Sequence, residues 1–246
     1  MSIETPEELA GLRAAGEVVA AAIRAMRRAV RPGVTTAELD AIAARVFAEA
    51  GARSGPQLDY GFPGVCCIGV NDEAVHGIPG ARRLRQGDLV KLDVTAELDG
   101  FYADACVTVA VGRTRPKDAA LIATARRALA AGLTVARAGA PLNTIGAAVE
   151  LTVVERGHAV CRDLMGHGIG RRIHELPDVP NWYVAGLTQP LTDGLVLTIE
   201  PIVSAGSGEV RTAADGWTVL TADQARSAHM EHTIVIRDGA PLVLTA

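Results

Sequence analysis

The sequence has only four cysteines, and they follow none of the spacings that cysteine-rich proteins use. Cys66 and Cys67 are neighbours, Cys106 and Cys161 stand alone, and no CxxC pair occurs. This pattern argues against a disulfide framework and against a zinc knuckle, because both need suitably spaced pairs. We expect reduced thiols that serve mostly in packing, with a catalytic thiol as the alternative.

Long apolar runs and blocks of one charge are also missing. Charged residues interrupt the alanine-rich stretch near the N-terminus, and the segment before it is acidic where a signal peptide would be basic. The 24 basic and 28 acidic residues are spread along the chain, with a net charge of −4. We therefore predict a cytoplasmic protein without a membrane span and without a nucleic-acid partner.

What the sequence does contain is a core-forming composition and clear helix signals. Of its 246 residues, 49% are hydrophobic, enough for a substantial core. Thr5, Pro6 and Glu8 form a helix start, and Thr35 with Glu38 forms a second capping box. Together with proline and glycine signals, these predict four helices, over about 6–30, 36–51, 116–136 and 142–156.

Residues 90–112 predict two strands joined at Asp99-Gly100. Each strand carries an aspartate, Asp93 or Asp104, among residues that otherwise suit burial. Because side chains alternate along a strand, Asp93 could lie on a solvated face, and Asp104 could likewise face water. A carboxylate inside an apolar hairpin needs a further reason.

The second part of the chain repeats the first. Residues 31–51 align without gaps onto 137–157, and three further matches follow in the same order. These pair His76-Gly77-Ile78 with His167-Gly168-Ile169, residues 87–93 with 194–200, and the Asp104 strand with residues 229–236. We predict an α+β fold of two helix-helix-strand-hairpin halves, about 1–112 and 113–246, related by a pseudo-two-fold axis around one central antiparallel sheet with helices on one side.

The repeat brings four carboxylates together, since it pairs Asp93 with Glu200 and Asp104 with Glu231. At about 4 Å and an effective dielectric of ~20, two like charges repel by roughly 4 kcal/mol, so the cluster must hold protons or cations. Two divalent ions would balance four charges, and His167 would add one nitrogen ligand. This donor set points to Mn, Fe(II), Co or Zn.

Simpler interpretations stand beside this one. Asp93 and Asp104 could face solvent, and Glu200, before Pro201, could be a strand end. The glycine-rich segment 166–171 could be a phosphate loop, although it lacks the G-x-G-x-x-G spacing and a βαβ context. We expect instead that its glycines let the backbone pass close beside a metal-bound histidine.

Five segments together resemble the type I methionine aminopeptidases, metallopeptidases of the pita-bread fold, over essentially the whole chain. They are NDEAVHGIP, GDLVKLDVTAELDGFYAD, GHGIGRRIHE, TIEP and SAHMEHTI. The resemblance implies a single catalytic domain over 1–246 that removes the N-terminal methionine from nascent proteins or peptides with a small second residue. It further implies two divalent ions (Co, Mn, Fe or Zn) and a peptide N-terminus as partner, with any ribosome contact made by the catalytic domain. We expect a monomer.

The same resemblance implies roles for individual residues. Asp93 would hold one ion, His167 and Glu200 the other, and Asp104 and Glu231 would bridge both. The implied catalytic residues are His76, beside the substrate amine, Glu200, as proton acceptor, and His174, which stabilises the reacting carbonyl. The implied substrate-binding residues are His76, Phe62, Cys67, Ile173 and Trp217.

Some positions depart from the family pattern near the expected pocket. Asp59-Tyr60 stands where Tyr-His is usual, and Arg172-Ile173 replaces Gly-Phe. A change of one methylene group in a hydrophobic pocket alters the discrimination between substrates by about 1–3 kcal/mol. The resemblance therefore implies a preference for methionine less firmly than it implies hydrolysis. Two alternatives stay open: a hydrolase of altered specificity, for example for a proline-linked dipeptide, and a non-enzymatic peptide- or ribosome-binding member.

Overall fold

The computed structural model describes residues 1–246. Its helices are α1 (Pro6–Ala29), α2 (Thr36–Ala50), α3 (Gly55–Tyr60), α4 (Pro116–Val135) and α5 (Asn143–Glu155). Its strands are β1 (Arg53–Ser54), β2 (Cys67–Val70), β3 (Glu73–Val75), β4 (Leu89–Leu98), β5 (Phe101–Ala110), β6 (Ala159–Val160), β7 (Gly166–Gly168), β8 (Glu175–Val179), β9 (Val196–Ile199), β10 (Ile202–Ser204), β11 (Val210–Thr212), β12 (Val219–Thr221), β13 (Ser227–His229), β14 (His232–Val235) and β15 (Leu242–Val243). None of the helices has the length and apolar character that crossing a bilayer requires.

The four predicted helices are confirmed, within one or two residues at each end. Thr35 and Glu38 form the expected reciprocal capping box at the start of α2, and Gly51 ends that helix with φ 71°. Helix α3 was not predicted, because its six residues are too few for a helical period to show.

The predicted hairpin is also confirmed. Strands β4 and β5 pair in antiparallel register from Leu89 with Ala110 to Leu98 with Phe101. Asp99 and Gly100 connect them with φ values of 50° and 81°, the left-handed pair that a two-residue turn needs to follow the twist of the strands.

The predicted central antiparallel layer is present, and within it the strands hydrogen-bond in four separate sheets, all with antiparallel pairs. The predicted strand 229–236 is interrupted at Met230 and Glu231, so that β13 pairs with β10 while β14 pairs with β9. The segment with which they pair is interrupted at the matching position, between β9 and β10, where Pro201 has no backbone N–H to donate. Glu200 and Glu231 therefore both lie where the chain passes from one sheet to another.

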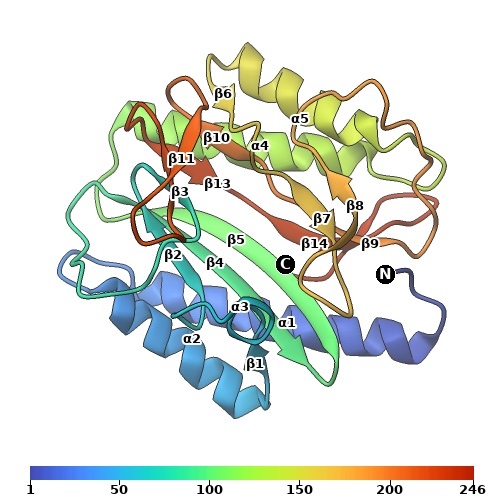
Figure 1. Cartoon of the computed structure of the whole chain (residues 1–246), viewed down its shortest axis with the longest axis horizontal. Helices are drawn as coiled ribbons and strands as arrows, with labels where there is room; N and C mark the ends of the chain where they lie inside the picture. Colours follow the sequence, from blue (N-terminus) through green and yellow to red (C-terminus); the bar gives the residue numbers. More distant parts are fainter.

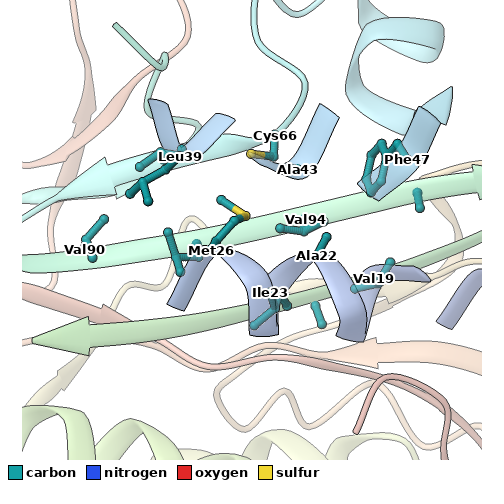
Figure 2. Packing of buried hydrophobic residues seen from close by; sticks show 14 of the residues in the cluster. Val19, Ala22, Ile23, Met26, Leu39, Ala43, Phe47, Cys66, Val90 and Val94 are labelled. Atoms are coloured by element: carbon teal, nitrogen blue, oxygen red, sulfur yellow. The ribbon is translucent and has the colours of Figure 1, made fainter. Parts of the chain in front are cut away.

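The helices cover the outer side of the strand layer in two pairs. Helix α1, next to α2, packs on β4 and β5, whereas α4, next to α5, packs on β10 and β13. Figure 1 shows the two pairs along the lower and upper edges of the view. Alternate residues of β4, among them Val90 and Val94, pack against Met26 and other side chains of α1 and α2 (Figure 2). Asp93 lies between them in sequence and so faces the opposite, inner side.

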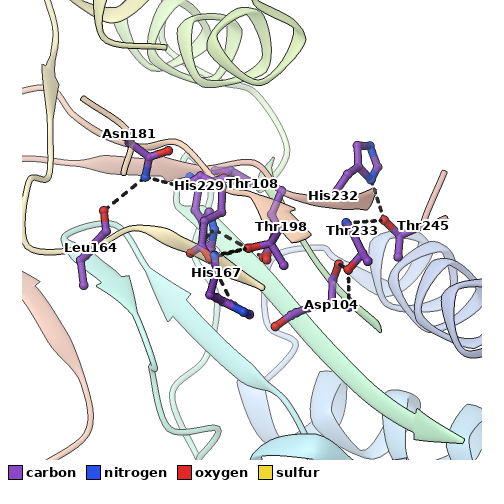
Figure 3. Close-up of polar contacts among 12 residues, drawn as sticks. Asp104, Thr108, Leu164, His167, Asn181, Thr198, His229, His232, Thr233 and Thr245 are labelled. Carbon is purple, nitrogen blue, oxygen red and sulfur yellow. Dashed lines mark hydrogen bonds and ion pairs between the residues drawn. The ribbon is translucent and has the colours of Figure 1, made fainter. Parts of the chain in front are cut away.

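Two threonines join β5 to β13 and β14. The Thr108 hydroxyl donates to the His229 carbonyl and accepts from the His229 N–H, both at 2.8 Å. The Thr233 hydroxyl likewise donates to the Asp104 carbonyl and accepts from the Asp104 N–H, both at 2.8 Å (Figure 3). We call this junction, Asp104–Thr108 with His229–Thr233, the seam. The seam fixes the backbone of Asp104 and holds the chain at His229 and Thr233, before and after Glu231. It therefore sets the distance between Asp104 and Glu231, which are far apart in the sequence.

Replacing Thr233 with valine should destabilise the protein by about 1–3 kcal/mol, because the buried N–H and C=O of Asp104 would both lose their partner without a change in side-chain shape. Urea unfolding of the metal-free protein measures this. Thr134→Val is the control: this exposed threonine bonds only within α4, so its loss should cost no more than about 0.5 kcal/mol. Equal stabilities of the two variants would contradict the role of the seam.

Candidate metal centre and active site

A cavity of about 410 Å³ opens on the inner side of the strand layer. All the residues predicted for the site line it: Phe62, Cys67, His76, Asp93, Asp104, His167, Ile173, His174, Glu200, Trp217 and Glu231. Of the departures from the family pattern, Tyr60 and Ile173 line the cavity, whereas Asp59 and Arg172 do not. Asp59 instead accepts from the Tyr102 hydroxyl and the Ile173 N–H, which ties the neighbouring loops together.

The acids are buried, which contradicts the solvent-facing interpretation for Asp104, whereas Glu200 does follow directly on the end of β9. Asp104, Glu200 and Glu231 are 6%, 9% and 2% exposed, and Asp93 is partly exposed toward the cavity. Burial raises the pKa of Asp104 to about 6. Burial, and then the charges of the neighbouring acids, raise the pKa of Asp93, Glu200 and Glu231 well above their usual range. An empty cluster would therefore hold protons near neutral pH, and cations would take their place.

The unpartnered atoms fit divalent ions. Buried Asp104 Oδ1 and Glu231 Oε1 have no hydrogen-bond partner. Two groups of ligand atoms converge within 4.8 Å, Asp104–His167–Glu231 and Glu200–His229–Glu231. They share Glu231, as the predicted bridging role requires, and Asp93 belongs to neither group. Oxygen-rich donors with imidazole nitrogen suit Mn, Fe(II), Co or Zn.

Strand β7 presents His167 with its ring already oriented. Its Nδ1–H donates to the Gly168 carbonyl at 2.9 Å, which leaves Nε2 without a proton and 3.4 Å from Glu200 Oε1. A Cβ on Gly166 would lie 2.6 Å from the Thr198 carbonyl oxygen, and one on Gly168 would lie 2.2 Å from that of Leu176. The glycines thus allow the close strand approach that the sequence analysis expected. The same segment is a strand rather than a phosphate loop.

Glu200 is fixed by two neighbours. The Thr198 hydroxyl accepts from the His167 N–H and donates to Glu200 Oε1, both at 3.0 Å. The Asn181 side chain donates to the Glu200 carbonyl at 3.0 Å. Thr198 therefore couples the positions of the histidine and the carboxylate.

His174 lies at the cavity rim in contact with Tyr60. The Tyr60 hydroxyl lies 2.5 Å from His174 Nδ1, and desolvation raises the pKa of Tyr60 and lowers that of His174, so both groups are neutral near pH 7. In the tautomer in which the phenol donates to Nδ1, Nε2 carries the ring proton and can donate into the cavity. The ring centroids of His174 and His167 are 4.2 Å apart. His76 adopts φ 56°, a left-handed conformation that is rare for histidine and is often found at functional sites.

The thiols are poor candidates for nucleophiles. All four cysteines are free and buried. Burial raises the pKa of each, in the case of Cys161 to about 12, so the reactive thiolate is disfavoured. The alternative of a catalytic thiol gains no support.

Two residues with a place at the site were missed in the sequence, and so was one contact. His229 lines the cavity beside Glu200 and Glu231, and Thr198 bonds Glu200. His229 had a readable signal, because it lies two residues before Glu231 and thus on the same side of an extended chain. Tyr60 was placed near the pocket, but its contact with His174 had no signal, since 114 residues separate the two.

Buried acids and histidines at the floor of an open cavity define the class of protein as a metal-dependent hydrolase. The model of metallopeptidase family M24 matches residues 10–238, and the chain belongs to this family. The chain is 39% identical over 242 residues to methionine aminopeptidase 1 of Bacillus subtilis and 40% identical over 247 residues to its methionine aminopeptidase 2. These alignments cover 98% and 100% of this chain, and 98% and 99% of the relatives.

Solved structures confirm the predicted pita-bread fold. The methionine aminopeptidase of Thermotoga maritima superposes with a TM-score of 0.96 at 36% identity, over 100% of this chain and 99% of that one. The prolidase of Pyrococcus furiosus superposes with a TM-score of 0.80 at 21% identity, over 99% of this chain and 65% of that one. The second likeness concerns the fold alone.

Proposed function

We propose that the protein is a two-metal aminopeptidase that removes the N-terminal methionine from nascent proteins or short peptides with a small second residue. The observation that carries the proposal is the gathering of four carboxylates and His167 at the floor of one cavity with apolar walls. High-coverage similarity to proteins named methionine aminopeptidase supports the substrate.

Asp93, Asp104, His167, Glu200 and Glu231 would hold the ions. Divalent ions in such a site lower the pKa of water and withdraw charge from a carbonyl oxygen. Glu200 accepts the proton of the attacking water and returns it to the leaving amine. His174 Nε2–H donates to the carbonyl oxygen of the scissile bond and favours the tetrahedral oxyanion. His76 accepts a hydrogen bond from the substrate's amino group. Desolvation at the cavity and the neighbouring His174 lower the pKa of His76, which favours the neutral, accepting ring.

The methionine side chain would occupy the apolar part of the cavity. Phe62 and Trp217 meet edge to face with ring centroids 5.3 Å apart, and Cys67 and Ile173 line the same cavity. Ile173 stands where an aromatic residue is usual, so this wall is softer and wider. We expect methionine to be preferred at the first position of the substrate. We also expect this pocket to accept other unbranched apolar residues more readily than a pocket with an aromatic residue in place of Ile173 would.

Peptides test this proposal directly. The protein, reconstituted with Mn or Co, should hydrolyse Met-Ala and Met-Gly-Met and leave Xaa-Pro dipeptides intact, as measured by kcat/KM. A series varied at the first position, with norleucine and leucine in place of methionine, measures the pocket. Preferential cleavage of Xaa-Pro would favour the altered-specificity alternative. No cleavage with any divalent ion bound would favour the non-enzymatic one.

We further propose that residues 1–246 act as one catalytic domain. Asp93 and Asp104 come from about 1–112, whereas His167, Glu200 and Glu231 come from about 113–246, so neither half carries the site alone. We propose that it works as a monomer on free N-termini. Nascent chains as substrates place its work in the cytoplasm, with any ribosome contact made by this domain.

Replacing Tyr60 with phenylalanine should lower kcat about tenfold with little change in KM. This loss is smaller than the roughly 10²–10³-fold that is typical when the hydrogen-bond donor to the oxyanion is itself removed. The reason is that His174 would lose the bond that fixes its tautomer while keeping its ring. Steady-state kinetics on Met-Ala measure this. Tyr183→Phe, which alters an exposed tyrosine, should match the wild type. An unchanged kcat in Tyr60→Phe would contradict a positioning role.

A further inference from the structure

His229 is a buried histidine whose ring has no partner. It ends β13, is 2% exposed, and neither Nδ1 nor Nε2 makes a hydrogen bond. A buried polar group left unpaired costs about 1–3 kcal/mol. The backbone, in contrast, is held on both sides by the Thr108 hydroxyl (Figure 3). The fold therefore fixes this ring in a place where nothing in the chain satisfies it.

The ring is aimed at two carboxylates. His229 Nε2 lies 3.6 Å from Glu231 Oε2 and 3.7 Å from Glu200 Oε2. These distances are long for hydrogen bonds, which need about 2.7–3.2 Å. They are close to the separation of atoms that share an ion, because two ligand atoms about 2.1 Å from a tetrahedral ion stand about 3.4 Å apart.

The cationic side chain nearest in the core, Lys91, does not neutralise these two carboxylates. Lys91 is buried nearby, but its Nζ donates to the Asn71 carbonyl at 2.7 Å and to the Ser227 hydroxyl at 3.2 Å. His167 offers a useful comparison, since its Nε2 lies 3.4 Å from the other oxygen of Glu200. The two imidazoles thus stand on either side of one carboxylate, and the two groups of converging atoms contain one imidazole each.

We infer that His229 Nε2 is a nitrogen ligand of one divalent ion, together with Glu231 and Glu200 Oε2, while His167 binds the other ion, so that each ion of the pair has one imidazole. Glu200 would then contact both ions, one through each carboxylate oxygen, in addition to the role that the resemblance gives it beside His167. This inference rests on the proposed use of two ions at this site, but not on the proposed substrate. A second imidazole changes the choice of metal, because nitrogen donors favour Co, Zn and Fe(II) over Mn.

The test is His229→Gln, which removes the imidazole and keeps a polar side chain of similar length. In the Co(II)-loaded protein, X-ray absorption should show that imidazole scattering per ion falls to about half of the wild-type value. Calorimetry should show that the Kd of one of the two Co(II) ions rises at least about tenfold, with a smaller change for Mn(II). The matched control is His158→Gln: this histidine also lacks a partner for Nδ1 but lies outside the cavity, so both measurements should match the wild type.

Two results would overturn the inference. One is a His229→Gln protein with unchanged imidazole scattering and unchanged Co(II) affinity. The other needs no variant: a wild-type protein with two Co(II) ions and the scattering of a single imidazole shared between them. Peptide hydrolysis is measured separately, so a protein that shows both imidazoles and cleaves no peptide would count against the proposed function and leave the metal ligand standing.

Discussion

Asp104→Asn should lower kcat/KM by about 10³-fold or more. The reason is that the two metal ions supply several kcal/mol of transition-state stabilisation, and the Asp104 side chain is predicted to bridge them. The substitution keeps the shape of Asp104, and its backbone bonds to Thr233 do not involve the carboxylate. It removes one of the negative charges that balance the ions, and the unpartnered Oδ1 loses its charge. Calorimetric titration should show that fewer than two ions bind tightly per chain.

The same hairpin provides the control for this prediction. Asp99→Asn alters an exposed aspartate at the turn, where φ is 50°, and asparagine tolerates this left-handed conformation well. It should retain wild-type kinetics and metal binding. If Asp104→Asn, folded and loaded with two ions, turned over Met-Ala at the wild-type rate, the assignment of the ligands would be wrong.

Removing the metal should abolish hydrolysis and also reverse the effect of pH on the site. Without ions, burial raises the pKa of Asp104 to about 6 and that of its neighbours well above their usual range. The folded metal-free protein then binds protons that the unfolded chain releases between about pH 4 and the folded pKa values. The contribution of these acids is greatest at low pH and is lost as the pH rises through about 6 and above. With ions bound, acidification has the opposite effect, because protons compete with the metal for the carboxylates.

The measurement is urea unfolding of the metal-free protein at pH 7.5 and pH 5.5, in comparison with metal-free Asp104→Asn. The variant lacks one such acid, so on acidification the wild type should gain stability relative to it, at up to about 1.4 kcal/mol per pH unit for one proton. Using the variant as reference cancels the histidines, whose lowered pKa values act in the other direction. A constant difference between the two proteins across this range would show that Asp104 is not held protonated by burial. Adding back Mn or Co should restore hydrolysis.

Local signals in the sequence predicted the helices and the hairpin because their causes are local. The capping box of α2 and the Asp99-Gly100 turn each depend on residues a few positions apart, and both occur as predicted. The predicted strand 229–236 was wrong for a different reason. An apolar pattern does not show that Met230 and Glu231 leave one sheet and enter another, because the partners that decide this, β9 and β10, lie about 30 residues away.

The sequence alone determined which residues could make the centre, since the repeat and the recognisable segments identified the acids and His167 before any geometry was known. Only the tertiary structure decided how they are held. The two-way threonine bonds of the seam, the Tyr60 hydroxyl on His174 and the unpartnered ring of His229 all join segments far apart in the chain. Such contacts depend on how the elements pack, and packing is set by the whole core rather than by any short stretch of residues.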